Sequence, residues 1–294
     1  MSTPVTLPRV AAGVMRWGAW GAQLSTPELQ ALIEGCLAAG VTCFDHADIY
    51  GDYTEEAAFG RVLAKAPALR DRMLLVTKCG IKLTTPNRPA HRLKSYDASR
   101  AHIVASAEGS LRALRTDRLD VLLLHRPDVL LDADEVAEAF RTLRDAGKVR
   151  AFGVSNFTPA QFALLESRWP GLLTNQVELS LKHVAPLTDG TLDQAQRLRR
   201  APMIWSPLGG GDLFSEASPL PQLSRKLAEL AECHATTPDV VAYAWVLMHP
   251  TRPTVVTGSS KLERIVRAQA ALAVDLTRED FYELLEAARG HEVA

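Results

Sequence analysis

The sequence predicts a (β/α)₈ barrel, the TIM-barrel architecture, in which eight parallel strands alternate with helices and mobile loops form the mouth. Short apolar runs alternate with segments of helical periodicity along nearly the whole chain, and eight such pairs are present. No G-x-G-x-x-G follows the first run, which argues against the main rival, an open doubly wound sheet that binds a dinucleotide. A barrel of roughly 250 residues or more suits the length, so we expect a single domain over residues 1–294.

The expected strands are short apolar runs, as is typical of strands buried in a parallel sheet. They lie at residues 10–15, 41–44, 73–77, 119–124, 149–154, 173–177, 202–205 and 254–256. Strands that alternate with helices are joined by right-handed crossovers, so their carboxyl ends meet at one mouth. Residues that directly follow the strands are therefore the first candidates for a functional site.

The expected helices fill the intervals between the strands. Pro27 lies just inside one helix start, Thr158 and Asp132 are predicted N-caps, and Gly40 and Gly147 follow helix ends. The helices lie at residues 28–39, 98–114, 132–145, 192–198, 221–233, 238–248, 261–272 and 278–288, with two more that begin near 54 and 158. Residues 80–97 show no clear periodicity, and a long connection of this kind is more often functional than accidental.

The composition narrows the class of protein. Hydrophobic residues make up 47% and charged residues 23%, so a large core can be buried, and the net charge is −1. The sequence has no basic stripe of the kind that binds nucleic acid or an anionic membrane. No apolar run approaches the 18 residues that would span a membrane, and residues 1–10 lack the long apolar segment of a signal peptide. The four cysteines are scattered without C-x-x-C spacing. Reduced thiols in a cytoplasmic protein, with no metal site, are the expectation.

Four chemically active side chains follow three successive expected strands. Asp45 and Tyr50 follow the second, Lys78 the third and His125 the fourth. The pKa of a free tyrosine is about 10, and a neighbouring ammonium lowers it, so Lys78 would make Tyr50 a better proton donor, with Asp45 orienting Lys78. Such a group protonates an oxygen on which negative charge develops, as carbonyl reduction requires, with the hydride coming from a cofactor.

Each of these residues also has a plainer interpretation. A single Asp or His after a strand is often structural, Lys78 suits a solvated loop, and Tyr53 competes with Tyr50 for the role of donor. A different chemistry also remains open, in which Lys78 forms a Schiff base in a barrel lyase or isomerase. The combination of four such residues at three strand ends favours the proton-donor interpretation.

The residues around these positions extend the pattern along the chain. From residue 13 to 264 the sequence resembles the aldo-keto reductase family, and within it the bacterial oxidoreductase branch that carries DHADIYG. The matching segments are FDHADIYGDYTEEAAFG, LLVTKCG, LDVLLLHRPD, GKVRAFGVSNFTPAQFALL, TNQVELS, WSPLGGG and TGSSKLERI. The resemblance implies a catalytic tetrad of Asp45, Tyr50, Lys78 and His125, with Tyr50 as proton donor. It also implies NADP(H) as the cofactor, bound without a Rossmann domain, and transfer of its 4-pro-R hydride to a small carbonyl substrate.

The resemblance assigns the cofactor-binding residues position by position. Ser155, Asn156 and Gln176 would bind the nicotinamide carboxamide, and Trp205 would stack on the ring. The loop residues Ser206, Pro207, Leu208 and Gly209 would lie against the pyrophosphate, and Gly258, Ser259, Ser260 and Arg264 against the adenosine 2′-phosphate. Taken alone, Ser155 and Asn156 suit a turn or helix cap, and Trp205 suits a core position at a strand end.

The adenosine end departs from the family pattern. Many members have a lysine where Gly258 stands, and Lys261 is a candidate replacement for its charge. Arg267 and Ala268 also differ from the acidic-plus-amide pair often found near the adenine. The missing lysine at Gly258 should therefore hold the preference for NADPH over NADH toward the lower end of a 10- to 100-fold range, about the size of one charge-assisted hydrogen bond.

The substrate walls are expected from loops near the mouth. Met15, Trp17, Trp20 and Tyr53 are the candidates, and aromatic and apolar walls favour aldehydes, ketones or quinones of modest size. Trp17 and Trp20 suit core packing equally well. A non-catalytic alternative is a redox sensor that binds NADP(H) as a regulatory module. An intact tetrad and the lack of an additional domain for a protein partner favour the enzyme, and we expect no obligate protein partner.

Overall fold

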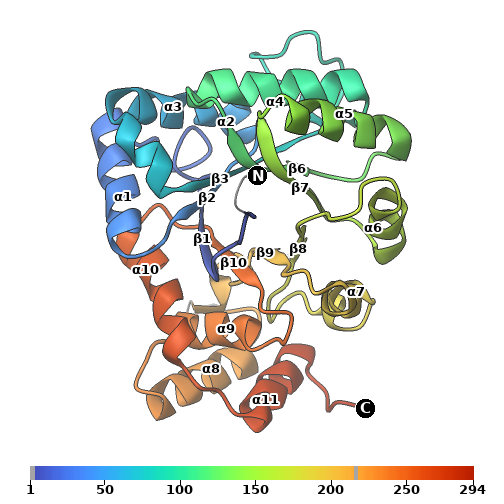
Figure 1. Ribbon diagram of the computed structural model, residues 1–294. Helices are drawn as coiled ribbons and strands as arrows, with labels where there is room; N and C mark the ends of the chain where they lie inside the picture. Colours follow the sequence, from blue (N-terminus) through green and yellow to red (C-terminus); the bar gives the residue numbers. More distant parts are fainter. Residues whose placement is uncertain (1–3, 215–217) are drawn as a thin grey trace.

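The computed structural model describes residues 4–214 and 218–294. Eight parallel strands close into a barrel in the spatial order β1-β10-β9-β8-β7-β6-β3-β2, with the helices around it (Figure 1). The barrel strands are β1 (Val10–Gly13), β2 (Cys43–Asp45), β3 (Leu74–Cys79), β6 (Leu119–Leu124), β7 (Val149–Ser155), β8 (Asn175–Glu178), β9 (Met203–Trp205) and β10 (Thr254–Thr257). The predicted (β/α)₈ barrel is confirmed.

Helices connect each strand to the next, and α9 and α11 both lie beside α8 (Figure 1). The helices are α1 (Thr26–Ala38), α2 (Tyr50–Tyr53), α3 (Glu55–Lys65), α4 (Arg100–Leu114), α5 (Ala133–Asp145), α6 (Pro159–Glu166), α7 (Thr191–Leu198), α8 (Pro221–Cys233), α9 (Pro238–Leu247), α10 (Leu262–Ala270) and α11 (Arg278–Arg289). Short 3₁₀ turns lie at Pro67–Arg72, Ala185–Leu187, Asp212–Phe214 and Ala271–Ala273. In the part of the chain that the structure describes, no helix is long and apolar enough to cross a membrane.

Local chemistry explains where several helices begin. The Asp132 carboxylate accepts from the backbone N–H of Asp134 at 2.8 Å, which satisfies one of the free donors at the start of α5. Thr158 caps α6, and Gln161 Oε1 accepts in turn from the Thr158 N–H at 3.0 Å. Both predicted N-caps are confirmed.

The core has two parts. The larger cluster packs helices against strands and includes Phe44, Phe59, Leu75 and Phe140. A smaller cluster consists of strand residues alone, and because successive side chains of a strand point to opposite faces, we assign it to the barrel interior. Its members are Ala11, Cys43, Val76, Val121, Leu123, Met203 and Val256. Apolar packing of this kind fixes the strand ends relative to one another.

The segment 80–97, expected to lack regular structure, contains a two-stranded antiparallel ribbon. Its strands are β4 (Ile81–Lys82) and β5 (Ser95–Tyr96). The connection between them folds back on Tyr53, whose hydroxyl accepts from the Leu83 N–H at 2.9 Å. The Arg88 guanidinium lies 4.4 Å from the centroid of the Tyr53 ring. The segment follows β3, so it borders the carboxyl ends of the strands, as its place in the chain predicts.

Candidate active site

Lys78 is the centre of the polar cluster at the mouth. It lies on β3 and is 1% exposed, because apolar strands surround it. Its ammonium donates to Asp45 Oδ2 at 2.8 Å, to the backbone carbonyl of His46 at 2.8 Å and to Tyr50 Oη at 3.1 Å. An ammonium has three N–H donors, so all three are used. The structure thus brings three of the four predicted tetrad residues into direct contact.

The charges in this cluster support one another. Burial disfavours the charge on Lys78, but Asp45 and Tyr50 outweigh that effect, and the pKa of Lys78 is raised above its ordinary value. Burial also raises the pKa of Tyr50, and the Lys78 ammonium offsets part of the rise, in the direction expected from the sequence. The result is a neutral phenol held against a charged lysine at neutral pH.

Tyr50 uses its hydroxyl oxygen to accept from Lys78, which leaves its own proton uncommitted. Among the described residues no acceptor pairs with that proton. Tyr53 differs, because its hydroxyl is bonded to the β4 segment at Leu83 N and lies at 3.4 Å from the Ile81 carbonyl. Of the two tyrosines, only Tyr50 contacts Lys78, so the geometry favours Tyr50 as the donor.

His125 follows β6 and completes the four predicted positions. Its ring lies 6.0 Å from the Tyr50 ring, centroid to centroid, in an edge-to-face arrangement. Burial, followed by the charges of Lys78, Arg126 and Lys94, lowers the pKa of His125 well below its ordinary value, so the imidazole is neutral. Its Nδ1 is buried without a hydrogen-bond partner. A neutral imidazole of this kind can hydrogen-bond a substrate oxygen beside Tyr50.

The three predicted carboxamide ligands lie together at the ends of β7 and β8. Ser155 Oγ donates to the Gln176 carbonyl at 2.9 Å, and Asn156 Nδ2 donates to Ser155 Oγ at 2.8 Å. Asn156 has a left-handed backbone with φ of 61°, a conformation that non-glycine residues keep chiefly where the surroundings impose it. Hydroxyl and amide groups in this arrangement match the donors and acceptors of a carboxamide.

Gln176 connects this group to the tetrad, which sequence reasoning did not anticipate. Its Nε2 donates to Asp45 Oδ1 at 2.9 Å, and both side chains are about 2% exposed. A carboxylate accepts but does not donate, so the amide must turn its NH₂ toward Asp45. Among the described residues no donor reaches Gln176 Oε1, which is therefore the atom left for a ligand amide.

Trp205 and the loop after β9 continue the mouth. Trp205 Nε1 donates to Asn156 Oδ1 at 2.9 Å, which joins the predicted stacking residue to the carboxamide group. The predicted pyrophosphate loop, Ser206, Pro207, Leu208 and Gly209, forms a turn closed by the Gly209 N–H on the Ser206 carbonyl at 2.8 Å. A Cβ at residue 209 would lie 2.8 Å from Lys182 Cδ, and φ is 57° there, so this turn requires glycine.

The predicted 2′-phosphate residues lie before and within the first turn of α10, and they face solvent. Ser259 Oγ accepts from the Lys261 N–H at 3.0 Å, and Arg264 is exposed, with no ion pair to another described residue. Nothing lies within 4 Å of a Cβ built on Gly258, so steric crowding does not explain the missing lysine. Arg267 pairs with Asp239 at 3.3 Å.

The structure separates the residues that were expected to form the substrate walls. Trp17 is fully buried, and its Nε1 donates to the Ser259 carbonyl at 2.8 Å. It is therefore a core residue that connects the loop after β1 to the segment predicted to bind the 2′-phosphate, and the expectation that it lines the pocket is wrong. Trp20 lies 6.1 Å from the Tyr50 ring, centroid to centroid. Met15 lies in the loop that follows β1 and is 37% exposed. Met15 and Trp20 therefore remain candidates for the substrate walls.

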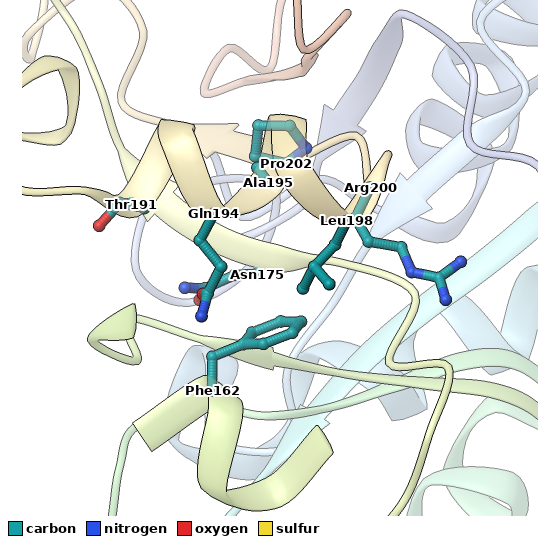
Figure 2. Close-up of a pocket in the computed structure, with 8 residues that line it drawn as sticks. All are labelled: Phe162, Asn175, Thr191, Gln194, Ala195, Leu198, Arg200 and Pro202. Atoms are coloured by element: carbon teal, nitrogen blue, oxygen red, sulfur yellow. The ribbon is translucent and has the colours of Figure 1, made fainter. Parts of the chain in front are cut away.

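A small cavity between α6, α7 and β8 is separate from this site (Figure 2). Its volume of about 10 Å³ holds at most about one water molecule. Figure 2 shows its lining residues, none of which is a predicted site residue: Phe162, Asn175, Thr191, Gln194, Ala195, Leu198, Arg200 and Pro202. The polar cluster at the barrel mouth, where the predicted tetrad residues converge, remains the candidate functional site.

Sequence reasoning also missed buried acids behind the tetrad and a cation beside it. Glu56 on α3 accepts from Thr77 Oγ1 at 2.6 Å, and burial raises its pKa to about 7. Arg126, directly after His125 in the quoted HRPD segment, lies 5.7 Å from the centroid of the Trp205 ring. The position of Arg126 next to His125 was a usable signal, whereas the burial of Glu56 was not visible in the sequence.

Comparison with known proteins agrees with this architecture. A family model described as "Aldo/keto reductase family" matches residues 9–289. "Oxidoreductase YdhF" of Escherichia coli is 51% identical over 287 residues, 97% of this chain and 95% of the relative. "6-dehydroglucose reductase" of Agrobacterium fabrum is 44% identical over 295 residues, 100% of this chain and 98% of the relative.

Among solved structures, an aldo/keto reductase from Klebsiella pneumoniae in complex with NADP and acetate superposes with a TM-score of 0.76 at 27% identity. The match covers 97% of this chain and 92% of that chain. The barrel topology, the cluster at its mouth and these matches point the same way. The chain belongs to the aldo/keto reductase family.

Proposed function

We propose that the protein is an NADPH-dependent reductase of aldehydes or ketones, in which Tyr50 gives a proton to the carbonyl oxygen. One observation carries the proposal: the buried Lys78 ammonium donates its three hydrogen bonds to Asp45, the His46 carbonyl and Tyr50. This arrangement holds the Tyr50 hydroxyl in place, occupies one of its two lone pairs and leaves its proton for a ligand. The chain then reduces carbonyls to alcohols.

The proton donor acts by geometry and charge. As negative charge develops on the substrate oxygen, Tyr50 passes its proton to that oxygen, and Lys78 stabilises the phenolate that remains. The neutral His125 ring hydrogen-bonds the same oxygen and orients it. Burial raises the pKa of Tyr50, so the hydroxyl stays protonated across neutral pH.

The residues at the mouth fit NADP(H). Ser155, Asn156 and the Oε1 atom of Gln176 would hold the carboxamide, and Trp205 would support the nicotinamide ring. The 206–209 turn would lie against the pyrophosphate, and Ser259, Ser260 and Arg264 against the 2′-phosphate. NADPH, when bound, supplies the hydride that the protein itself cannot provide.

The alternative chemistries find less support. A Schiff-base lysine must be a neutral, accessible amine, whereas Lys78 is charged, buried and committed to three acceptors. A redox sensor that binds NADP(H) needs no proton donor aimed at a ligand, so the uncommitted Tyr50 proton favours the enzyme. We further propose a single cytoplasmic domain that acts on small carbonyl compounds and needs no nucleic acid or obligate protein partner.

The direct test is a carbonyl panel assayed by loss of NADPH absorbance, with wild type, Tyr50→Phe and the control Tyr53→Phe. The panel includes 6-dehydroglucose, because that compound names the Agrobacterium relative. We expect Tyr50→Phe to lower turnover by about 10²- to 10⁴-fold, the range of general acid catalysis, and Tyr53→Phe to leave most of it. Turnover by Tyr50→Phe near the wild-type value would refute Tyr50 as donor.

A further inference from the structure

Arg126 is a cation at the mouth that the proposed mechanism does not use. It follows His125 at the end of β6, is half-buried, and its guanidinium lies 5.7 Å from the centroid of the Trp205 ring. Trp205 in turn donates to Asn156, so Arg126 stands where the tetrad and the proposed carboxamide seat meet. A guanidinium over an aromatic ring is a stable arrangement that leaves its N–H donors pointing outward.

No described residue satisfies those donors. Two other arginines that approach the interior have acceptors: Arg70 bonds Asp120 at 2.8 Å, and Arg9 bonds the Leu247 carbonyl at 2.6 Å. Arg126 forms no ion pair or hydrogen bond with any residue that the structure describes. A half-buried guanidinium beside the proposed carboxamide seat, without a protein acceptor, is available to a ligand oxygen.

The surroundings of Arg126 strengthen the case for an electronegative partner. Its charge acts on both Tyr50 and His125, and the Lys94 charge, from the connection between β4 and β5, acts on His125 as well. The nearest tetrad acid, Asp45, has both oxygens engaged by Lys78 and Gln176. Among the described residues no acid forms an ion pair with Arg126 or Lys94, so no direct partner neutralises the two charges on the side of the mouth next to His125.

We propose that Arg126, supported by Lys94, determines specificity by binding an oxygen substituent on the first or second carbon beyond the reacting carbonyl. The preferred substrates are then hydroxylated or carboxylated aldehydes. This inference rests on the proposed reductase function and names its substrate class. The guanidinium fork binds two oxygens at once, either a carboxylate or neighbouring hydroxyls. The cofactor does not need this cation, because its phosphates are assigned to 206–209 and 258–264 and its carboxamide is neutral.

The test compares matched substrates that differ only in oxygen substituents: glyceraldehyde with propanal, and succinic semialdehyde with butanal. The variants are Arg126→Met, which keeps length but removes the donors, and Arg126→Lys, which keeps the charge. Arg88→Met is the matched control, since Arg88 also lies over an aromatic ring, at 4.4 Å from Tyr53. The measured quantity is the ratio of kcat/KM between the two members of each pair.

We expect Arg126→Met to lower that ratio by about 10- to 100-fold, the size of one or two charge-assisted hydrogen bonds, and Arg88→Met to leave it unchanged. Arg126→Lys should retain more of the carboxylate preference than of the hydroxyl preference, which identifies the group that is bound. Equal losses for both members of a pair, or a weaker Kd for NADPH in Arg126→Met, would overturn the proposal.

A binding measurement separates this inference from the reductase proposal. Succinate and glycerol are titrated against the protein with NADP⁺, and tryptophan fluorescence reports binding beside Trp205. If wild type binds these probes and Arg126→Met does not, the subsite is supported even when no aldehyde is reduced. In that case only the proposed reaction fails. Equal binding by wild type and Arg126→Met, or none by wild type, refutes the subsite.

Discussion

At the tetrad, both oxygens of Asp45 and all three donors of Lys78 have buried partners within the protein, whereas the Arg264 guanidinium at α10 faces solvent without an ion pair among the described residues. The two regions are parts of one proposed cofactor site. A group that transfers a proton must be oriented before the reaction begins, because reorganisation adds to the barrier. A group that only holds a phosphate can be ordered by the ligand itself.

This difference predicts where mutations cost stability and where they cost only affinity. Buried pairs at the tetrad should matter to both folding and turnover, and exposed residues at α10 should matter to cofactor choice alone.

Lys78→Met leaves the Asp45 carboxylate buried without its cation. We expect a loss of about 3–5 kcal/mol in the free energy of unfolding, measured by urea denaturation, and loss of turnover in the folded fraction. Lys82→Met is the control, since its pair with Asp97, at 3.6 Å and about one-third exposed on each side, contributes at most about 1 kcal/mol. Equal costs for the two variants would remove the distinction between the regions.

Glu56 gives the buried side a pH signature. Burial raises the pKa of Glu56 in the folded protein to about 7, from an ordinary value of 4.5. The contribution of Glu56 to the free energy of unfolding is therefore fully present below pH 4.5 and is lost as the pH rises through about 7. Glu56→Gln keeps a polar amide near Thr77 and cannot ionise. Relative to wild type, it should become more stable by about 3 kcal/mol between pH 4 and pH 8, measured by urea denaturation.

The control for this comparison is Glu232→Gln on the exposed face of α8, which should show the wild-type pH dependence. A pH dependence of Glu56→Gln identical to that of wild type would mean that Glu56 has the same pKa in the folded and unfolded protein. The buried acids behind the tetrad would then need a different account.

Arg264→Ala should weaken NADPH binding by about 10- to 100-fold and scarcely change NADH binding, because one charge-assisted bond contributes roughly 1.5–3 kcal/mol. Titration of both cofactors by tryptophan fluorescence measures this, and urea denaturation should show no loss of stability. Gly258→Lys is the matched change of opposite sign, since a Cβ there meets no atom within 4 Å, and it should tighten NADPH binding. Equal losses for both cofactors in Arg264→Ala would mean that Arg264 does not contact the phosphate.

The same contrast explains how far the sequence predicts this molecule. The fold followed from apolar runs, and the strand at residues 119–124 agrees at both ends with β6, because six consecutive buried residues fit few other structures. The ribbon of β4 and β5 was missed, because strands of two residues carry no periodicity. The carboxyl ends of the strands gave the positions of the tetrad, since a parallel barrel brings them together.

The internal connections of the site were beyond sequence reasoning. Gln176 and Asp45 are 131 residues apart, and only the closed barrel brings the amide against the carboxylate. Trp17 was a candidate for the mouth because its loop follows β1, but the burial of its ring depends on packing that no local pattern encodes. The roles of the tetrad and cofactor residues stay predictions until the variants above are measured.

The most direct test of the proposed reaction follows a label from the cofactor. Wild-type protein is incubated with [4R-²H]NADPH and an aldehyde from the panel, and the alcohol is analysed by mass spectrometry. A reductase of the proposed kind puts one deuterium on the carbinol carbon from the 4R-labelled cofactor and none from the 4S-labelled cofactor. With Tyr50 as the donor, Tyr50→Phe should form very little of the labelled alcohol. Label delivered from the 4S-labelled cofactor instead would contradict the proposed use of the 4-pro-R hydride, and alcohol without label from either cofactor would contradict direct hydride transfer.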